Sequence, residues 1–213
     1  RFMGEELYGI ILILLAESNI LQPIFSFGLQ HAVIKYFSAA SSKKEQDKLL
    51  LFSLLIPLLI ILPSGFVFFG NYDQIAAYLS TQNPEVASFT YLIFVIAIST
   101  AYFEIFYSWS RVQKKTIVGN FLKEVYQRVM ITTLILVYVL QWFDFNGFII
   151  ALIVGYYLRL TIIMVYSLWL YRPHIHFEWP ENNKQLWTYI LLIFLSAFGA
   201  SVIIDIDAGM LGK

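Results

Sequence analysis

The sequence contains no cysteine, and it carries few charged residues for its length. Without cysteine the chain has no disulfide framework, no zinc–thiolate site and no cysteine nucleophile. Only 13% of its 213 residues are charged, whereas an average soluble domain has about 25%. This charge is too little to cover a water-facing surface, so the composition excludes a soluble globular enzyme.

The sequence also lacks the signatures of several function classes. Lys and Arg total 14 and balance 14 Asp and Glu, which argues against a nucleic-acid partner. No G-x-x-x-x-G-K-[ST], H-E-x-x-H or G-x-S-x-G pattern occurs, so the chain has no ATP-binding loop, zinc-protease helix or hydrolase elbow. We therefore predict that the protein is not an enzyme and has neither a cofactor nor a metal site.

Long apolar runs are abundant. Hydrophobic residues make up 59% of the chain, and the mean hydropathy is +0.72. Six runs are each long enough to cross a ~30 Å hydrocarbon core as a helix, and their apolar character on all sides disfavours barrel strands. They cover residues 8–33, 49–70, 86–109, 125–142, 147–171 and 187–204. The pattern predicts an all-α fold, a polytopic transmembrane helix bundle with about six spans.

The loops between these runs alternate in charge. Residues 35–48, 111–128 and 172–185 hold eleven of the fourteen basic residues. The two intervening loops, 71–85 and the short one around Asp144, hold none. Cytoplasmic loops of membrane proteins are enriched in Lys and Arg. We therefore expect the three basic loops to lie together on the cytoplasmic side.

Helix-breaking residues occur inside the first two runs. Pro23 and Gly28 lie in the first, and Pro57, Pro63 and Gly65 lie in the second. Membrane helices tolerate such residues when neighbouring groups satisfy the freed carbonyls. We expect both runs to be interrupted, either as static kinks or as the broken helices that transporters use.

A few polar side chains fall inside the predicted spans, where ionisable groups are costly and usually functional. Glu17 lies ~13 Å below the outer interface at 1.5 Å per residue. Asn19 and Gln22 share one helical face with Ser26, whereas Glu17 lies off that face. We predict substrate binding by Glu17, Asn19 and Gln22, and ion coupling through Glu17 or through Glu104 in the third span.

Arg159 is the only basic residue near the middle of a predicted span. Its guanidinium fork can bind a phosphate or carboxylate through two parallel hydrogen bonds. One interpretation is structural, with Arg159 neutralising Glu17 at a depth that differs by only ~6 Å. The other is functional, with Arg159 lining a central cavity and binding an anionic headgroup. The two are compatible if the pair opens for substrate.

Three segments resemble motifs of the bacterial polysaccharide-biosynthesis membrane proteins, the O-antigen and lipid-linked-oligosaccharide flippases of the multidrug/oligosaccharidyl-lipid/polysaccharide exporter superfamily. Their patterns are R-x-L-G-x-E-x-Y-G, a Leu-Gly-Leu run ending in Ile-Arg-Phe-Phe, and Asp-x-x-Met-Leu/Ile-Gly. This chain has Met3, Phe27 and Lys35 where Leu, Leu and Arg are commoner, and Ala208 where a basic residue is usual. The matching segments are residues 1–9 (RFMGEELYG), 27–37 (FGLQHAVIKYF) and 204–212 (IDIDAGMLG).

The resemblance implies a fold of two six-helix lobes around a central cavity that opens alternately to each side of the membrane. The chain would then cover family helices two to seven. Residues 1–171 would form the first lobe without its first helix, residues 172–186 a cytoplasmic inter-lobe linker, and residues 187–213 the start of the second lobe.

The resemblance also implies a function. The substrate would be an isoprenoid-pyrophosphate-linked oligosaccharide, flipped across the bacterial inner (cytoplasmic) membrane for surface polysaccharide or lipopolysaccharide synthesis. Membrane lipid, a glycan polymerase and glycosyltransferases are the expected partners, and Arg159 is our candidate for the pyrophosphate. Two alternatives remain: a cation-coupled multidrug exporter of the same superfamily, and a non-transport membrane subunit or glycan-modifying enzyme.

Overall fold

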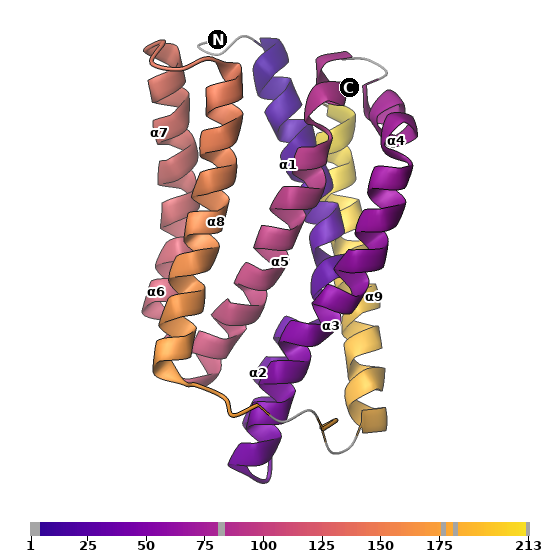
Figure 1. The fold of residues 1–213 in the computed structure, drawn as a ribbon, viewed down its shortest axis with the longest axis vertical. Helices are drawn as coiled ribbons and strands as arrows, with labels where there is room; N and C mark the ends of the chain where they lie inside the picture. The colour runs from indigo at the N-terminus through magenta and orange to yellow at the C-terminus, as the bar shows by residue number, and fades with distance from the viewer. Residues whose placement is uncertain (1–4, 81–83, 176–177, 181–182, 212–213) are drawn as a thin grey trace.

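The computed structural model is an elongated bundle of helices (Figure 1). It describes residues 5–80, 84–175, 178–180 and 183–211, with side chains described between residues 9 and 200. No strand occurs in these ranges, so the predicted all-α bundle is confirmed. The elements are α1 (Glu5–Ser26), α2 (Leu29–Phe37), α3 (Lys43–Gly70), α4 (Tyr72–Leu79), the 3₁₀ helix η1 (Pro84–Phe89), α5 (Tyr91–Val112), α6 (Ile117–Asn120), the π-helix η2 (Phe121–Tyr126), α7 (Gln127–Val139), α8 (Phe145–Leu170) and α9 (Asn183–Leu211).

All six predicted spans fall on helices. Within the described residues, four helices are long and apolar enough to cross a membrane, and a shorter apolar helix covers Lys184–Ala200. The remaining span lies on a continuous helical stretch, residues 117–139, built from α6, η2 and α7. The four long helices are Gly9–Ser26, Lys43–Gly70, Val86–Val112 and Phe145–Leu170. The chain is therefore a multi-pass membrane protein.

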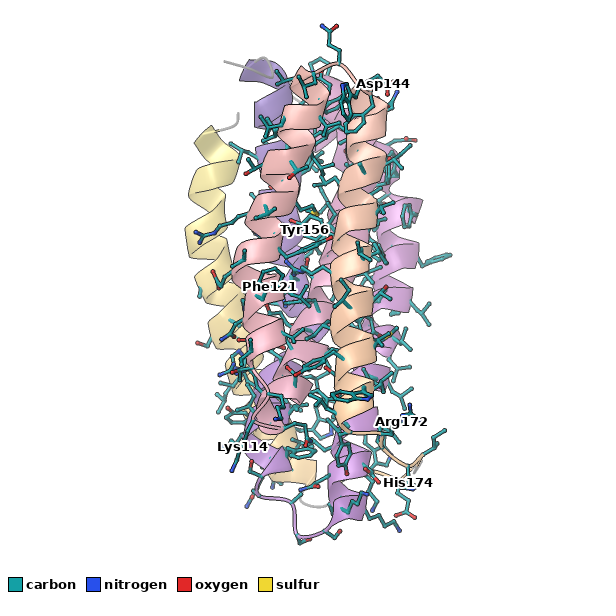
Figure 2. All side chains as sticks on the ribbon, turned by 90° about the vertical axis from the view of Figure 1, so that its left-hand side faces the viewer. Lys114, Phe121, Asp144, Tyr156, Arg172 and His174 are labelled. Atoms are coloured by element: carbon teal, nitrogen blue, oxygen red, sulfur yellow. The ribbon has the colours of Figure 1, made fainter. Side chains whose placement is uncertain are left out.

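The three basic loops lie at one end of the bundle. The turns from α2 to α3, from α5 to α6 and from α8 to α9 are all at the lower end in Figure 1. Figure 2 places Lys114, Arg172 and His174 at that end and Asp144 at the other. The predicted grouping of the three basic loops at one end of the bundle is therefore confirmed.

The first predicted span is interrupted, but the second is not. Phe27 and Gly28 have positive φ values of 47° and 72°, and they separate α1 from α2. By contrast, α3 continues through Pro57 and Pro63 as one helix, so the second span is not a broken helix. Proline removes a backbone donor without reversing the sign of φ, whereas a left-handed residue ends the helical path.

α5 is the central helix of the bundle and runs obliquely between α8 and α1 (Figure 1). Two buried serines tie α8 to it: Ser99 Oγ donates to the carbonyl of Tyr156 at 3.0 Å, and Ser167 Oγ donates to the carbonyl of Phe106 at 2.8 Å. Such interhelical hydrogen bonds satisfy polar groups where lipid offers no partner. α5 therefore forms the fixed support for the residues described below.

The segment after α8 packs back against the start of α3. Tyr171 donates a hydrogen bond to Asp47 Oδ1 at 2.6 Å, and the Asp47 side chain is only 2% exposed. The Trp179 ring meets Phe52 edge to face, with 5.3 Å between centroids. Aromatic pairs of this geometry add stability beyond the area they bury. The chain between α8 and α9 is thus held against α3.

Candidate functional site

A cavity of about 530 Å³ lies between the helices of the bundle. Tyr156, one of its lining residues, projects near mid-height of the molecule in Figure 2, well away from both ends. Its polar lining comes from six elements: Asn19 and Gln22 of α1, Gln30 and His31 of α2, Thr100, Glu104, Tyr107, Ser108 and Arg111 of α5, Lys123 of η2, Gln127 of α7, and Tyr156 and Arg159 of α8. A polar cavity at this depth is the natural place for a transported ligand.

Arg159 projects from α8 into this cavity and is only 3% exposed. Its Nη1 donates to Gln127 Oε1 at 2.5 Å, and Gln127 Nε2 in turn donates to the hydroxyl of Tyr156 at 3.0 Å. The guanidinium carbon lies 3.8 Å from the centroid of the Phe103 ring. These contacts fix the plane of the guanidinium by a cation–π contact and a neutral hydrogen bond. Neither contact supplies a negative charge.

The Arg159 side chain also has a donor without a partner. The buried Nε of Arg159 has no hydrogen-bond partner, and among the described residues Arg159 joins no carboxylate in an ion pair. An unsatisfied buried donor is costly, more so when it belongs to a charged group. The arrangement therefore suits an anionic ligand that enters the cavity.

Two further cations, Lys123 and Arg111, line the cavity. Lys123 Nζ pairs with Glu104 Oε1 at 2.7 Å. Lys123 Nζ lies 5.4 Å from the centroid of the Tyr107 ring, and the Arg111 guanidinium carbon lies 5.5 Å from it. With His31 neutral, three cations and one carboxylate give the cavity a net charge of two positive. Arg111 is exposed and Lys123 is partly exposed, so solvent screens part of this charge, whereas the charge of Arg159 is buried.

Lys123 and Gln127 line this cavity although the sequence pattern does not single them out. Lys123 precedes the predicted fourth span, and Gln127 lies at its start. The sequence pattern therefore places Lys123 in a loop. The helix instead begins at Ile117, and both side chains line the cavity, Lys123 from the π-turn Phe121–Tyr126 and Gln127 from the start of α7. Single π-turns occur mostly at functional sites. The spacing of four residues between the two positions was the available signal, because such residues share a helix face.

The predicted site residues divide between two hollows. Asn19, Gln22 and Glu104 line the cavity with Arg159. Glu17 lines a different hollow of about 480 Å³, bordered by α3, α4 and α5. Two residues along a helix turn the side chain to the opposite side, so the structure does not bring Glu17 to Arg159. The predicted neutralisation of Arg159 by Glu17 is replaced by the hydrogen bond to Gln127.

The described residues contain no group of three or more His, Asp or Glu side chains close enough to hold a metal ion. The structure does not describe the side chains of residues 1–8 and 204–212. These positions hold most of the first motif and all of the third. The chemistry that can be assigned is therefore the binding of a polar anion by Arg159, Lys123 and Arg111.

Comparison with known proteins gives one positive result. A search of curated proteins and a search of solved structures returned no match. The family model described as "Polysaccharide biosynthesis protein" matches residues 1–213. Because this match covers the entire chain, the chain belongs to the polysaccharide biosynthesis protein family.

Proposed function

We propose that this protein flips an isoprenoid-pyrophosphate-linked oligosaccharide across the bacterial inner membrane by alternating access. The observation that carries the proposal is Arg159, a buried guanidinium in a cavity at mid-bundle, with an unpartnered Nε. A pyrophosphate diester carries one ionised oxygen on each phosphate, which balances the two positive charges of the cavity. Binding of the diester would also satisfy the free donor of Arg159.

The rest of the proposal follows from this assignment. Residues 1–171 form the first lobe, residues 172–186 the inter-lobe linker and residues 187–213 the start of the second lobe. Glycosyltransferases supply the lipid-linked glycan on the cytoplasmic side, and a polymerase uses it on the other for surface polysaccharide or lipopolysaccharide. The protein moves its substrate without making or breaking a covalent bond.

The test compares Arg159→Ala and Arg159→Lys in cells that depend on the protein for surface-glycan display, and in vesicles that contain a fluorescent isoprenoid-pyrophosphate saccharide. A charge-assisted hydrogen bond contributes about 1.5–3 kcal/mol, so Arg159→Ala should lower the flipping rate by about 10- to 100-fold. Arg159→Lys keeps the charge without the fork and should retain an intermediate rate.

Arg128→Ala is the matched control, because Arg128 is exposed and pairs with Glu124 on the outer face of the helix, at 3.7 Å. It should flip the lipid at the wild-type rate. Full glycan display with Arg159→Ala would remove Arg159 from the mechanism. Drug resistance that depends on the protein, without any lipid flipping, would favour a multidrug exporter instead.

A further inference from the structure

We propose that three amide side chains on one wall of the cavity, Asn19, Gln22 and Gln30, bind the sugar attached to the pyrophosphate. In this assignment, Gln30 Oε1 accepts a hydrogen bond from a hydroxyl or an amide N–H of that sugar. The inference rests on the proposed function, and it extends the site from the anionic part of the substrate to the neutral part.

The cavity has two chemically different walls. Asn19, Gln22 and Gln30 come from α1 and α2, whereas the charged Lys123 and Arg159 come from η2 and α8. An amide offers both donors and an acceptor without charge, which is what a ring of hydroxyl groups requires. The two walls together therefore match a ligand with an anionic end and a neutral polyhydroxyl end.

Gln30 provides the sharpest observation. Its side chain is only 9% exposed, and its Oε1 is buried without a hydrogen-bond donor. The α1–α2 break at Gly28 lies two residues earlier and sets the direction in which α2 leaves α1. A buried acceptor without a partner costs stability, and a ligand that donates to it removes that cost. Arg159 Nε and Gln30 Oε1 are thus an unpartnered donor and an unpartnered acceptor on opposite walls of one cavity.

Amides in membrane helices often serve instead to join one helix to another. The three amides here do not have that role. Gln22 Nε2 donates to Ser26 Oγ at 3.1 Å, within its own helix, and no hydrogen bond in the described part of the chain joins Asn19, Gln22 or Gln30 to a different helix. Ala197 of α9 lines the same cavity and adds little bulk. The amide wall is therefore open to a ligand.

The experiment measures how much the sugar adds to binding. The protein in lipid nanodiscs is titrated with an isoprenoid pyrophosphate and with the same lipid carrying one N-acetylhexosamine. The ratio of the two dissociation constants is the sugar advantage. Wild-type protein should bind the sugar-bearing lipid about tenfold more tightly. Gln30→Met has a similar length and no acceptor, so it should lower the advantage to about twofold, as expected for one lost hydrogen bond.

Two variants keep the result interpretable. Gln30→Glu retains an acceptor oxygen and should keep the sugar advantage, even where the added charge weakens both lipids. Gln113→Met is the matched control, because Gln113 also has a buried amide atom without a partner but lies outside the cavity; it should bind like the wild type.

The outcomes separate the two proposals. An unchanged sugar advantage in Gln30→Met would overturn the sugar subsite while leaving the pyrophosphate site intact. If Arg159→Ala weakened neither lipid, the proposed function itself would fail. Two results together would support both proposals. Gln30→Met should lose the sugar advantage, and Arg159→Ala should weaken the binding of both lipids about equally.

Discussion

At the scale of single residues, the cavity combines two kinds of cation. Arg159 has no ion-pair partner among the described residues, whereas Lys123 is already paired. Arg159 is held by the neutral Gln127 and by the Phe103 ring. Lys123, by contrast, is neutralised by Glu104 at 2.7 Å. An anionic ligand therefore meets Arg159 directly, but it competes with Glu104 for Lys123. We therefore predict that Glu104 limits how tightly an anion binds.

Glu104→Gln should therefore strengthen anion binding. The substitution removes the competing carboxylate and leaves Lys123, which is 40% exposed, free for the ligand. Partly exposed ion pairs contribute at most about 1 kcal/mol, so isoprenoid pyrophosphate should bind about three- to fivefold more tightly, measured in nanodiscs at low salt. The gain in affinity of Glu104→Gln over the wild type should shrink at high salt, because screening weakens the interaction between exposed charges.

Glu124→Gln is the control for this prediction, since Glu124 pairs with Arg128 and both are largely exposed. It should leave the affinity unchanged. Weaker binding by Glu104→Gln would show that the carboxylate positions Lys123 for the ligand and does not compete with it.

At the scale of elements, the sequence predicted where helices lie better than where they bend. The apolar runs located all six spans because burial in lipid depends on hydropathy, which composition reports directly. The uninterrupted α3 and the early start of the α6–η2–α7 stretch escaped prediction. Both depend on neighbouring helices, which satisfy or reposition backbone groups. Arg159 can be singled out from the sequence because a lone cation in a predicted span is conspicuous. Gln30 and Gln127 are neutral, so the sequence does not single them out.

The break between α1 and α2 is the element most open to a direct test. Gly28 has φ of 72°, and a Cβ added there would lie 3.1 Å from the carbonyl oxygen of Ile190 and 3.2 Å from the backbone nitrogen of Phe194, both in α9. Gly28→Ala should destabilise the protein by about 1–2 kcal/mol for the left-handed backbone. The steric contact with α9 adds to this cost. Thermal unfolding in detergent should show a melting temperature lower by about 3–8 °C.

Gly70→Ala serves as the control for this substitution, because a Cβ at Gly70 meets no atom within 4 Å. Its melting temperature should stay within about 1 °C of the wild type, as expected for a surface change. Equal melting temperatures for the two variants would mean that α2 and α9 adjust to the Cβ, and that the break is not a fixed feature of the fold.

At the scale of the whole molecule, the segment between α8 and α9 is bound to α3 by charge as well as by packing. Glu178 Oε2 lies 2.8 Å from Lys48 Nζ and 3.0 Å from Lys44 Nζ. The hydrogen bonds from Lys48 and Lys44, with their positive charges, lower the pKa of Glu178 from 4.5 to about 2. A rocking motion of α9 relative to the earlier helices would pull on this contact. The contact therefore links α3 to the segment that leads into α9.

Glu178→Gln should release this segment. Because the chain lacks cysteine, a single Ile175→Cys substitution at a side chain that is 70% exposed allows a nitroxide label to report local mobility by electron paramagnetic resonance. The mobile fraction should rise about two- to fivefold in Glu178→Gln, as expected for exposed ion pairs, and high salt should produce the same change in the wild type.

Since the folded pKa of Glu178 is lowered, its contribution is complete above about pH 4.5 and is lost as the pH falls toward 2. The wild-type label should therefore become more mobile in that acid range, and the part of this change that is due to Glu178 should be absent from the variant. Identical spectra for the two proteins at neutral pH would mean that the Tyr171–Asp47 and Trp179–Phe52 contacts hold the segment without help from the Glu178 ion pairs.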